Sequence, residues 1–158
     1  MNTFTVTFIG HRQIDCFSAV EQQLERILES LFFEKEYICF YVGRNGDFDQ
    51  MAASTVLRLK KRLRNDNSSL IWALPYLTAE FRENEKSFTS YYDEVELFDE
   101  LNGCHPKAAI QKRNRLMVDK ADLVIAYVKT NTGGAYQTLR YAERSNKEIF
   151  NLYNIVGK

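Results

Sequence analysis

Hydrophobic residues follow two different spacings along the chain, and each spacing predicts one kind of element. Residues 4–9 alternate β-branched and aromatic side chains, as a strand does. Three short continuous apolar runs, at residues 37–42, 70–74 and 122–128, are typical of strands buried on both faces of a sheet. Between these runs apolar residues recur every three or four positions, which predicts helices over residues 17–33 and 49–63.

The second half of the chain adds two more helices and a last strand. Pro106 suits the first turn of a helix over residues 106–120, because the N–H that proline lacks would have no partner there. Gly133 and Gly134 lead into a helix that ends near residue 145, and residues 148–153 predict a final strand. Residues 78–101 mix acidic and aromatic side chains without a clear period, so a short strand, a helix and a loop over one edge all stay open.

Strands that alternate with helices predict βαβ units, and therefore an α/β fold with a mostly parallel sheet and helices on both faces. No low-complexity linker, repeat or charge block divides the sequence, so residues 1–158 are expected to form one domain. No apolar run approaches the roughly 18 residues of a membrane span. The N-terminus also lacks the basic region of a signal peptide.

Charge and cysteine content limit which binding partners, metal sites and cellular compartments the sequence favours. Lys plus Arg and Asp plus Glu each number 21, and this balance weighs against a chain that mainly coats nucleic acid or an anionic membrane. The three cysteines form no CxxC pair and only two histidines accompany them, so we expect no metal site. Unpaired, widely spaced cysteines also favour a reducing cytoplasm.

Five of the seven glycines follow predicted strands: Gly10, Gly43, Gly46, Gly133 and Gly134. In an open α/β sheet, ligands bind beyond the carboxyl ends of the strands. Glycine lets the backbone approach a ligand closely there, and the free N–H groups of a helix start attract anions. Three such turns at one sheet edge indicate a ligand that carries phosphate, with ordinary turn chemistry as the alternative.

Polar side chains beside these turns supply candidate contacts. Arg12 can present its planar fork to a phosphate, or pair with a nearby acid. Asp47 and Asp49 can accept from ribose hydroxyls or cap a helix. Arg113 shares a face with apolar residues, and an unpaired buried guanidinium is costly, so we expect it to face a cleft. The candidate ligand-binding residues are Gly10, His11, Arg12, Gly43, Asn45, Gly46, Asp47, Asp49, Tyr92, Arg113, Asn114, Gly133, Gly134, Ala135 and Thr138.

In order and spacing these pieces resemble the SLOG superfamily of Rossmann-like domains, and within it the stand-alone bacterial and phage members of the YpsA-like type. The match runs through residues 7–12, 42–49, 92–93, 113–119, 121–122 and 133–135. The superfamily includes the lonely-guy phosphoribohydrolases, the DNA-processing protein of natural transformation, and sensors of nucleotides derived from NAD. The resemblance implies a pocket for a nucleotide or an ADP-ribose-like molecule at the carboxyl edge of the sheet.

One departure from that resemblance separates binding from catalysis. The lonely-guy hydrolases carry Gly-Gly-x-Gly-Thr-x-x-Glu, whose Glu takes part in cleaving the N-glycosidic bond. Here Gly133-Gly134 lacks the later glycine, and Arg140 or Tyr141 stands at the carboxylate position. We therefore expect binding of a phosphorylated nucleotide or NAD-derived molecule without turnover and without a further cofactor, with Tyr91 and Tyr92 stacking on its base.

Two other functions remain open from the sequence. One is hydrolysis of the N-glycosidic bond of a nucleoside monophosphate, with Asp47, Asp49 or Asp93 as the substitute carboxylate. The other is binding of single-stranded DNA, as in the DNA-processing protein, which the zero net charge disfavours. Self-association is compatible with the sequence, but no residue pattern identifies an interface.

Overall fold

A computed structural model describes residues 2–156 and contains a sheet of six strands, all parallel. Their order across the sheet is β4-β3-β2-β1-β5-β6, so the chain moves outward in one direction and then returns past β1. This arrangement confirms the predicted α/β class and parallel sheet. The strands are β1 (Thr3–Gly10), β2 (Tyr37–Val42), β3 (Ser68–Leu74), β4 (Glu94–Leu97), β5 (Leu123–Tyr127) and β6 (Glu148–Asn151).

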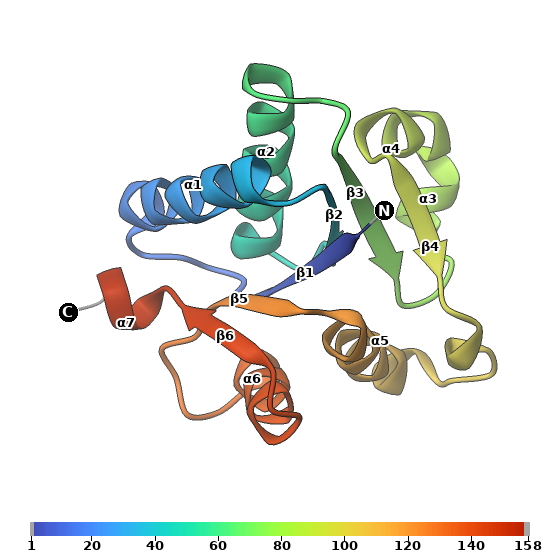
Figure 1. Ribbon diagram of the computed structural model, residues 1–158. Coiled ribbons are helices and arrows are strands. Elements are labelled where there is room, and N and C mark those ends of the chain that lie inside the picture. The colour runs from blue at the N-terminus through green and yellow to red at the C-terminus, as the bar shows by residue number, and fades with distance from the viewer. Residues whose placement is uncertain (1, 157–158) are drawn as a thin grey trace.

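Helices cover both faces of this sheet, as Figure 1 shows. The first layer holds the crossovers from β1 to β4, and the second holds those from β4 to β6. The first consists of α1 (Phe17–Glu34), α2 (Asp47–Arg62), α3 (Ala79–Glu83) and α4 (Glu85–Tyr91); the second consists of α5 (Pro106–Lys120) and α6 (Gly134–Arg144). A 3₁₀ turn, η1 (Asp99–Leu101), precedes α5, and α7 (Tyr153–Val156) lies beside α1.

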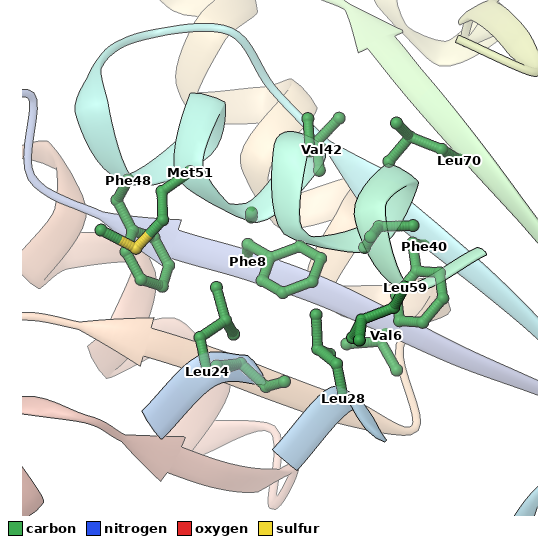
Figure 2. Close-up of a cluster of buried hydrophobic side chains, with 14 of the residues drawn as sticks. Val6, Phe8, Leu24, Leu28, Phe40, Val42, Phe48, Met51, Leu59 and Leu70 are labelled. Atoms are coloured by element: carbon green, nitrogen blue, oxygen red, sulfur yellow. The ribbon is translucent and has the colours of Figure 1, made fainter. Parts of the chain in front are cut away.

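The main core lies between β1–β3 and the pair α1 and α2 (Figure 2). Leu24 and Leu28, four residues apart on α1, meet Phe8 and Phe40 of the sheet, and all four side chains are almost completely buried. Burial of each such side chain contributes roughly 1.5–3 kcal/mol. A smaller core on the opposite face joins β5 to α5 and α6.

Several element boundaries differ from the prediction for local reasons. The last strand ends at Asn151 instead of residue 153, because the Asn151 side chain accepts from the N–H groups of Val128 and Tyr153 and turns the chain into α7. The open segment 78–101 contains two short helices, a strand and a 3₁₀ turn. Neither α3 nor α4 fully buries a residue, which explains why this segment shows no hydrophobic period.

The strand order places a crevice at the carboxyl ends of the strands. The connection after β1 runs over one face and the connection after β5 over the other, so the loops that follow these adjacent strands diverge. None of the helices within residues 2–156 combines the length and the apolar character that crossing a membrane requires.

Candidate functional site at the carboxyl rim of the sheet

A cleft of about 360 Å³ opens at the carboxyl ends of the strands, where the turns after β1 and β2 face α5 and α6. We call it the rim cleft. Its lining brings together nine of the candidate residues, which come from four separate segments of the chain. Together with the apolar and amide groups that complete the wall, the lining is Phe8, Ile9, Gly10, His11, Arg12, Asn45, Asp49, Ile110, Gln111, Asn114, Met117, Gly134, Ala135 and Thr138.

Two glycines allow close packing between the segments that follow β1 and β2. A Cβ on Gly10 would lie 2.4 Å from the Phe48 ring, and a Cβ on Gly46 would lie 2.4 Å from Arg12 Cα. The Asp47 N–H donates to the Arg12 carbonyl at 2.9 Å. Neither turn can therefore accommodate a side chain at its glycine without moving the other turn.

His11 joins the same turn to the loop after β5. Its Nε2 accepts a hydrogen bond from the Lys129 N–H at 2.9 Å, and its ring meets Tyr127 edge-on with centroids 6.2 Å apart. Burial, and then the charge of Lys129, lower the pKa of this imidazole. Because Nε2 must be unprotonated to accept, the neutral ring holds the two loops together.

Arg12 differs from Arg44 and Lys129, the cations in the loops after β2 and β5. Its side chain is exposed and lies at the cleft wall. Within residues 2–156 it forms no ion pair, whereas Arg44 contacts Glu80, and Lys129 contacts Asp15. The Arg12 guanidinium is therefore available to an anion in the cleft.

Asp47 and Asp49 do not occupy the N-cap of α2, which is Gly46. Asp49 turns back and accepts from the Asn45 N–H at 3.0 Å, while Asp47 accepts from the Ile14 N–H at 3.3 Å. Burial raises the pKa of Asp49, although the Asn45 N–H and Arg113 oppose the shift. Both carboxylates thus shape the loops around the cleft.

Arg113 corrects one prediction, because its side chain is buried and does not line the rim cleft. Only 1% of its surface is exposed, and its Nη1 donates to the Ala73 carbonyl at 2.7 Å. Its Nε donates to Asn114 Oδ1 at 2.9 Å, which fixes the amide that does line the cleft. The carbonyl at the end of β3 supplies a buried partner, so the guanidinium does not need to face a cleft. Burial lowers the pKa of Arg113.

Gly43 makes room for this buried cation. A Cβ on Gly43 would lie 3.1 Å from both Arg113 Nη2 and Asp49 Oδ2, so the guanidinium and the carboxylate both lie close to the space that a side chain would take. Gly43 and Arg113 therefore lie behind the wall of the cleft. Of the candidate residues, Gly43, Gly46, Asp47, Tyr92, Arg113 and Gly133 do not line it.

The start of α6 forms the far wall of the cleft. Gly133 is the N-cap and has a φ of +96°, a conformation that favours glycine. Gly134 faces Gln111, whose Nε2 would lie 2.8 Å from a Cβ placed there. The Thr138 hydroxyl donates to the Gly134 carbonyl at 3.0 Å, so it is satisfied within the helix.

Gln111 lines the cleft although it is not among the residues predicted from the sequence. It lies one helical turn before Asn114 on α5, and the i, i+3 spacing on that helix was the available signal. Phe8 and Ile9 also line the cleft, although they belong to a strand predicted as core.

A second cavity, of about 280 Å³, lies on the other side of the turn after β2. Tyr92 belongs to this cavity and only 2% of it is exposed, because its ring packs on Trp72 with centroids 5.2 Å apart. Tyr92 is therefore mainly a core residue. Its neighbour Tyr91 also lines the second cavity and is 41% exposed.

The zero net charge of the chain does not predict the local charge at the rim cleft, because many charges pair with each other elsewhere. Arg58 pairs with Glu21 and Glu25, and Arg62 pairs with Glu25 and Glu29. These pairs lie between α1 and the second half of α2, and α2 runs away from the carboxyl ends of the strands. A sum over the whole chain therefore says little about the charge that a ligand meets at the cleft.

The positions compared with the hydrolase carboxylate lie outside the rim cleft. Arg140 pairs with Glu143 at 3.5 Å, and the Tyr141 hydroxyl donates to Asp119 at 2.6 Å. Asp49 is the one carboxylate among the cleft-lining residues of the described chain. No group of three or more His, Cys, Asp or Glu side chains within residues 2–156 is arranged to hold a metal ion.

No protein-family model matches the chain, and no curated protein matches its sequence. Its structure is similar to that of DNA processing protein A (DprA) from Streptococcus pneumoniae, with a TM-score of 0.68 and 16% identity over 94% of this chain and 50% of that one. It is also similar to DprA from Helicobacter pylori, a protein that binds single-stranded DNA, with a TM-score of 0.64 and 18% identity. That match covers 94% of this chain and 64% of the other, so the chain spans less than two thirds of either protein.

These neighbours correct two expectations from the sequence. A free nucleotide or ADP-ribose-like molecule ranked first as the ligand, and the charge balance weighed against nucleic acid. A chain with this fold binds single-stranded DNA in Helicobacter pylori, which contradicts both preferences and favours the alternative ranked lower. At these identities the likeness establishes the architecture, and the chain has a Rossmann-like fold of the kind found in the DprA proteins.

Proposed function

We propose that this chain is a SLOG-type domain that binds single-stranded DNA at the carboxyl rim of its sheet. The observation that carries the proposal is the exposed Arg12 guanidinium at the rim cleft, which has no ion-pair partner within the described residues. The likeness to a single-stranded DNA-binding protein of the same fold supports it.

In this proposal the phosphate backbone of the strand crosses the rim cleft. The planar guanidinium of Arg12 can donate two parallel hydrogen bonds to two oxygens of one phosphate. Across the cleft, backbone N–H groups at the Gly133-Gly134 start of α6 attract the same charge. The amide groups of Gln111 and Asn114 line the cleft between them and offer further donors.

The size of the cleft favours a single strand over a duplex. A volume of about 360 Å³ lies at the lower end of the range for clefts that enclose one small ligand, about 300–1,000 Å³. Such a space can take the backbone of one strand, whereas a duplex presents two strands that base pairing holds together.

Fluorescence anisotropy with a labelled oligothymidylate tests the proposal. A length of about 20 nucleotides spans the roughly 4–16 nucleotides of a typical single-strand site. The variant is Arg12→Ala, and the matched control is Arg64→Ala, which removes the same charge from an exposed side chain between α2 and β3, at the opposite end of the sheet. Loss of a charge-assisted hydrogen bond, about 1.5 kcal/mol or more, predicts at least a tenfold loss of affinity for the first variant only.

The salt dependence gives a second readout. Each phosphate contact to a single strand contributes about −0.7 to the slope of log K against log salt, so Arg12→Ala should make the slope shallower by about that amount. Wild-type protein that fails to bind the oligonucleotide, or equal affinities for the Arg12 and Arg64 variants, refutes the proposed function.

A further inference from the structure

The second cavity has aromatic walls, and we call it the aromatic groove. It is bounded by the start of α1, the first half of α2 and the end of α4, and its lining is Phe17, Arg44, Asp47, Gln50, Met51, Ala53, Ser54, Tyr91 and Tyr92. It shares the turn after β2 with the rim cleft: Asn45 and Asp49 line the cleft, whereas Arg44 and Asp47 line the groove. A ligand in one cavity therefore has to cross only this turn to reach the other.

Two aromatic rings in the groove remain open to solvent. Phe17 is 43% exposed and Tyr91 is 41% exposed, although the neighbouring Tyr92 is 2% exposed and belongs to the core. Tyr91 meets Tyr92 edge-on at 4.9 Å, so its position is fixed from behind while part of its surface stays free. Exposed aromatic side chains are groups on which unpaired bases stack.

The charges in the groove suit a base better than a phosphate. Arg44 is held in place by Glu80 at 3.2 Å and by the Tyr92 hydroxyl at 3.4 Å, and its guanidinium lies 5.0 Å from the centre of the Phe88 ring. Glu80 offsets its charge, and the exposed Asp47 carboxylate repels an anion. The Gln50 side chain, in contrast, offers a donor and an acceptor that match the edge of a base.

We propose that the aromatic groove is a base-stacking subsite, in which an unpaired base of the strand that crosses the rim cleft stacks on Tyr91 and Phe17. The inference rests on the proposed function, because it assigns the base and the phosphates of one strand to two adjacent cavities. It adds a reason for strand selectivity, since a base within a duplex has both faces covered and cannot enter the groove.

The experiment compares Tyr91→Ala with wild type on two strands of equal length, an oligothymidylate and an abasic oligomer with the same phosphates. Low salt keeps phosphate contacts alone measurable. We expect Tyr91→Ala to weaken binding to oligothymidylate about tenfold, within the range for base–aromatic stacking, and to leave binding to the abasic strand unchanged. Tyr91→Phe keeps the ring and should restore the affinity. Phe33→Ala removes an exposed ring, 68% accessible, at the far end of α1 and serves as the control.

Photo-crosslinking supplies a readout that a purely structural role of Tyr91 would not change. A strand with 5-iododeoxyuridine in place of thymidine should crosslink to peptides that contain Phe17 or Tyr91, as mapped by mass spectrometry. Crosslinks confined to the rim cleft, or equal binding of Tyr91→Ala and wild type to oligothymidylate while Arg12→Ala binds weakly, overturn the stacking subsite and leave the proposed function standing. Wild-type protein that binds neither strand overturns both.

Discussion

Replacement of Gly46 by alanine tests whether the turns after β1 and β2 are held in contact as described. The new Cβ would lie 2.4 Å from Arg12 Cα and 2.9 Å from the Arg12 carbonyl oxygen. The favoured separation of two carbon atoms is about 3.5–4.0 Å, so the turns must separate by about 1 Å or more. The atoms in the way belong largely to backbone, which cannot rotate aside as the end of a side chain can.

The separation also breaks the hydrogen bond between the Asp47 N–H and the Arg12 carbonyl, which now spans 2.9 Å. Its loss costs about 0.5–1.5 kcal/mol. The overpacking adds about 1–3 kcal/mol. We therefore expect Gly46→Ala to lower the free energy of unfolding by about 1.5–4.5 kcal/mol.

Urea unfolding measures this loss, with fluorescence of Trp72 as the probe, since it is the one tryptophan in the sequence and is buried against Tyr92. With a slope of about 2 kcal/mol per molar urea, the midpoint should fall by about 1–2 M. Gly134→Ala is the matched control, because its Cβ meets only the flexible end of Gln111, at 2.8 Å. We expect a change within about 1 kcal/mol there, since alanine also favours the helix.

Two outcomes would refute this reasoning. If Gly46→Ala unfolds within about 0.5 kcal/mol of wild type, the turns can separate at little cost. If Gly134→Ala loses as much stability as Gly46→Ala, the cost does not follow from contact with backbone. In either case the tight apposition of the two turns would not be what holds Arg12 at the cleft.

Two further predictions concern the buried Arg113 and the partly buried His11. Arg113→Met should lower the free energy of unfolding by about 3 kcal/mol, because the Ala73 carbonyl and the Asn114 side chain lose their donor; an unchanged urea midpoint would mean that relief from burying the charge offsets the lost bonds. The lowered pKa of His11 means that the unfolded chain binds a proton at higher pH than the folded chain. Its contribution to stability should therefore be fully present above its unfolded pKa of about 6.5 and be lost as the pH falls through its folded pKa. His11→Gln should weaken this dependence in urea midpoints taken at several pH values, and a dependence equal to that of wild type would contradict the role of the bond from Lys129.

Local signals account for most of the elements that the sequence predicted. Proline at position 106 and the spacing after it depend only on neighbouring residues, and the structure has a helix with the predicted bounds 106–120. The segment 78–101 lacked such a signal because α3 and α4 are held by distant contacts. Phe81 and Phe88 pack on Trp72 of β3 with centroids 5.9 and 4.9 Å apart, so their hydrophobic partners are not on their own helices.

The same distinction explains the site. Glycines after strands could be recognised in the sequence, because the parallel sheet brings all such turns to one edge, and two of the five, Gly10 and Gly134, do line the rim cleft. The burial of Arg113 could not be predicted from the sequence, because the carbonyl that accepts from it, that of Ala73, lies 40 residues away along the chain. Tyr92 likewise became a core residue through Trp72, which is 20 positions earlier in the numbering.

The turn that contains His11 and Arg12 accepts hydrogen bonds from two other loops, through Nε2 of the first residue and the carbonyl of the second. Three segments at the rim are thus already mutually ordered before any ligand arrives. The conformational entropy of arranging them is lost during folding, so a ligand need not offset it on association. Affinity then depends mainly on the few groups that face the ligand. Binding does not require flexible loops to close around it.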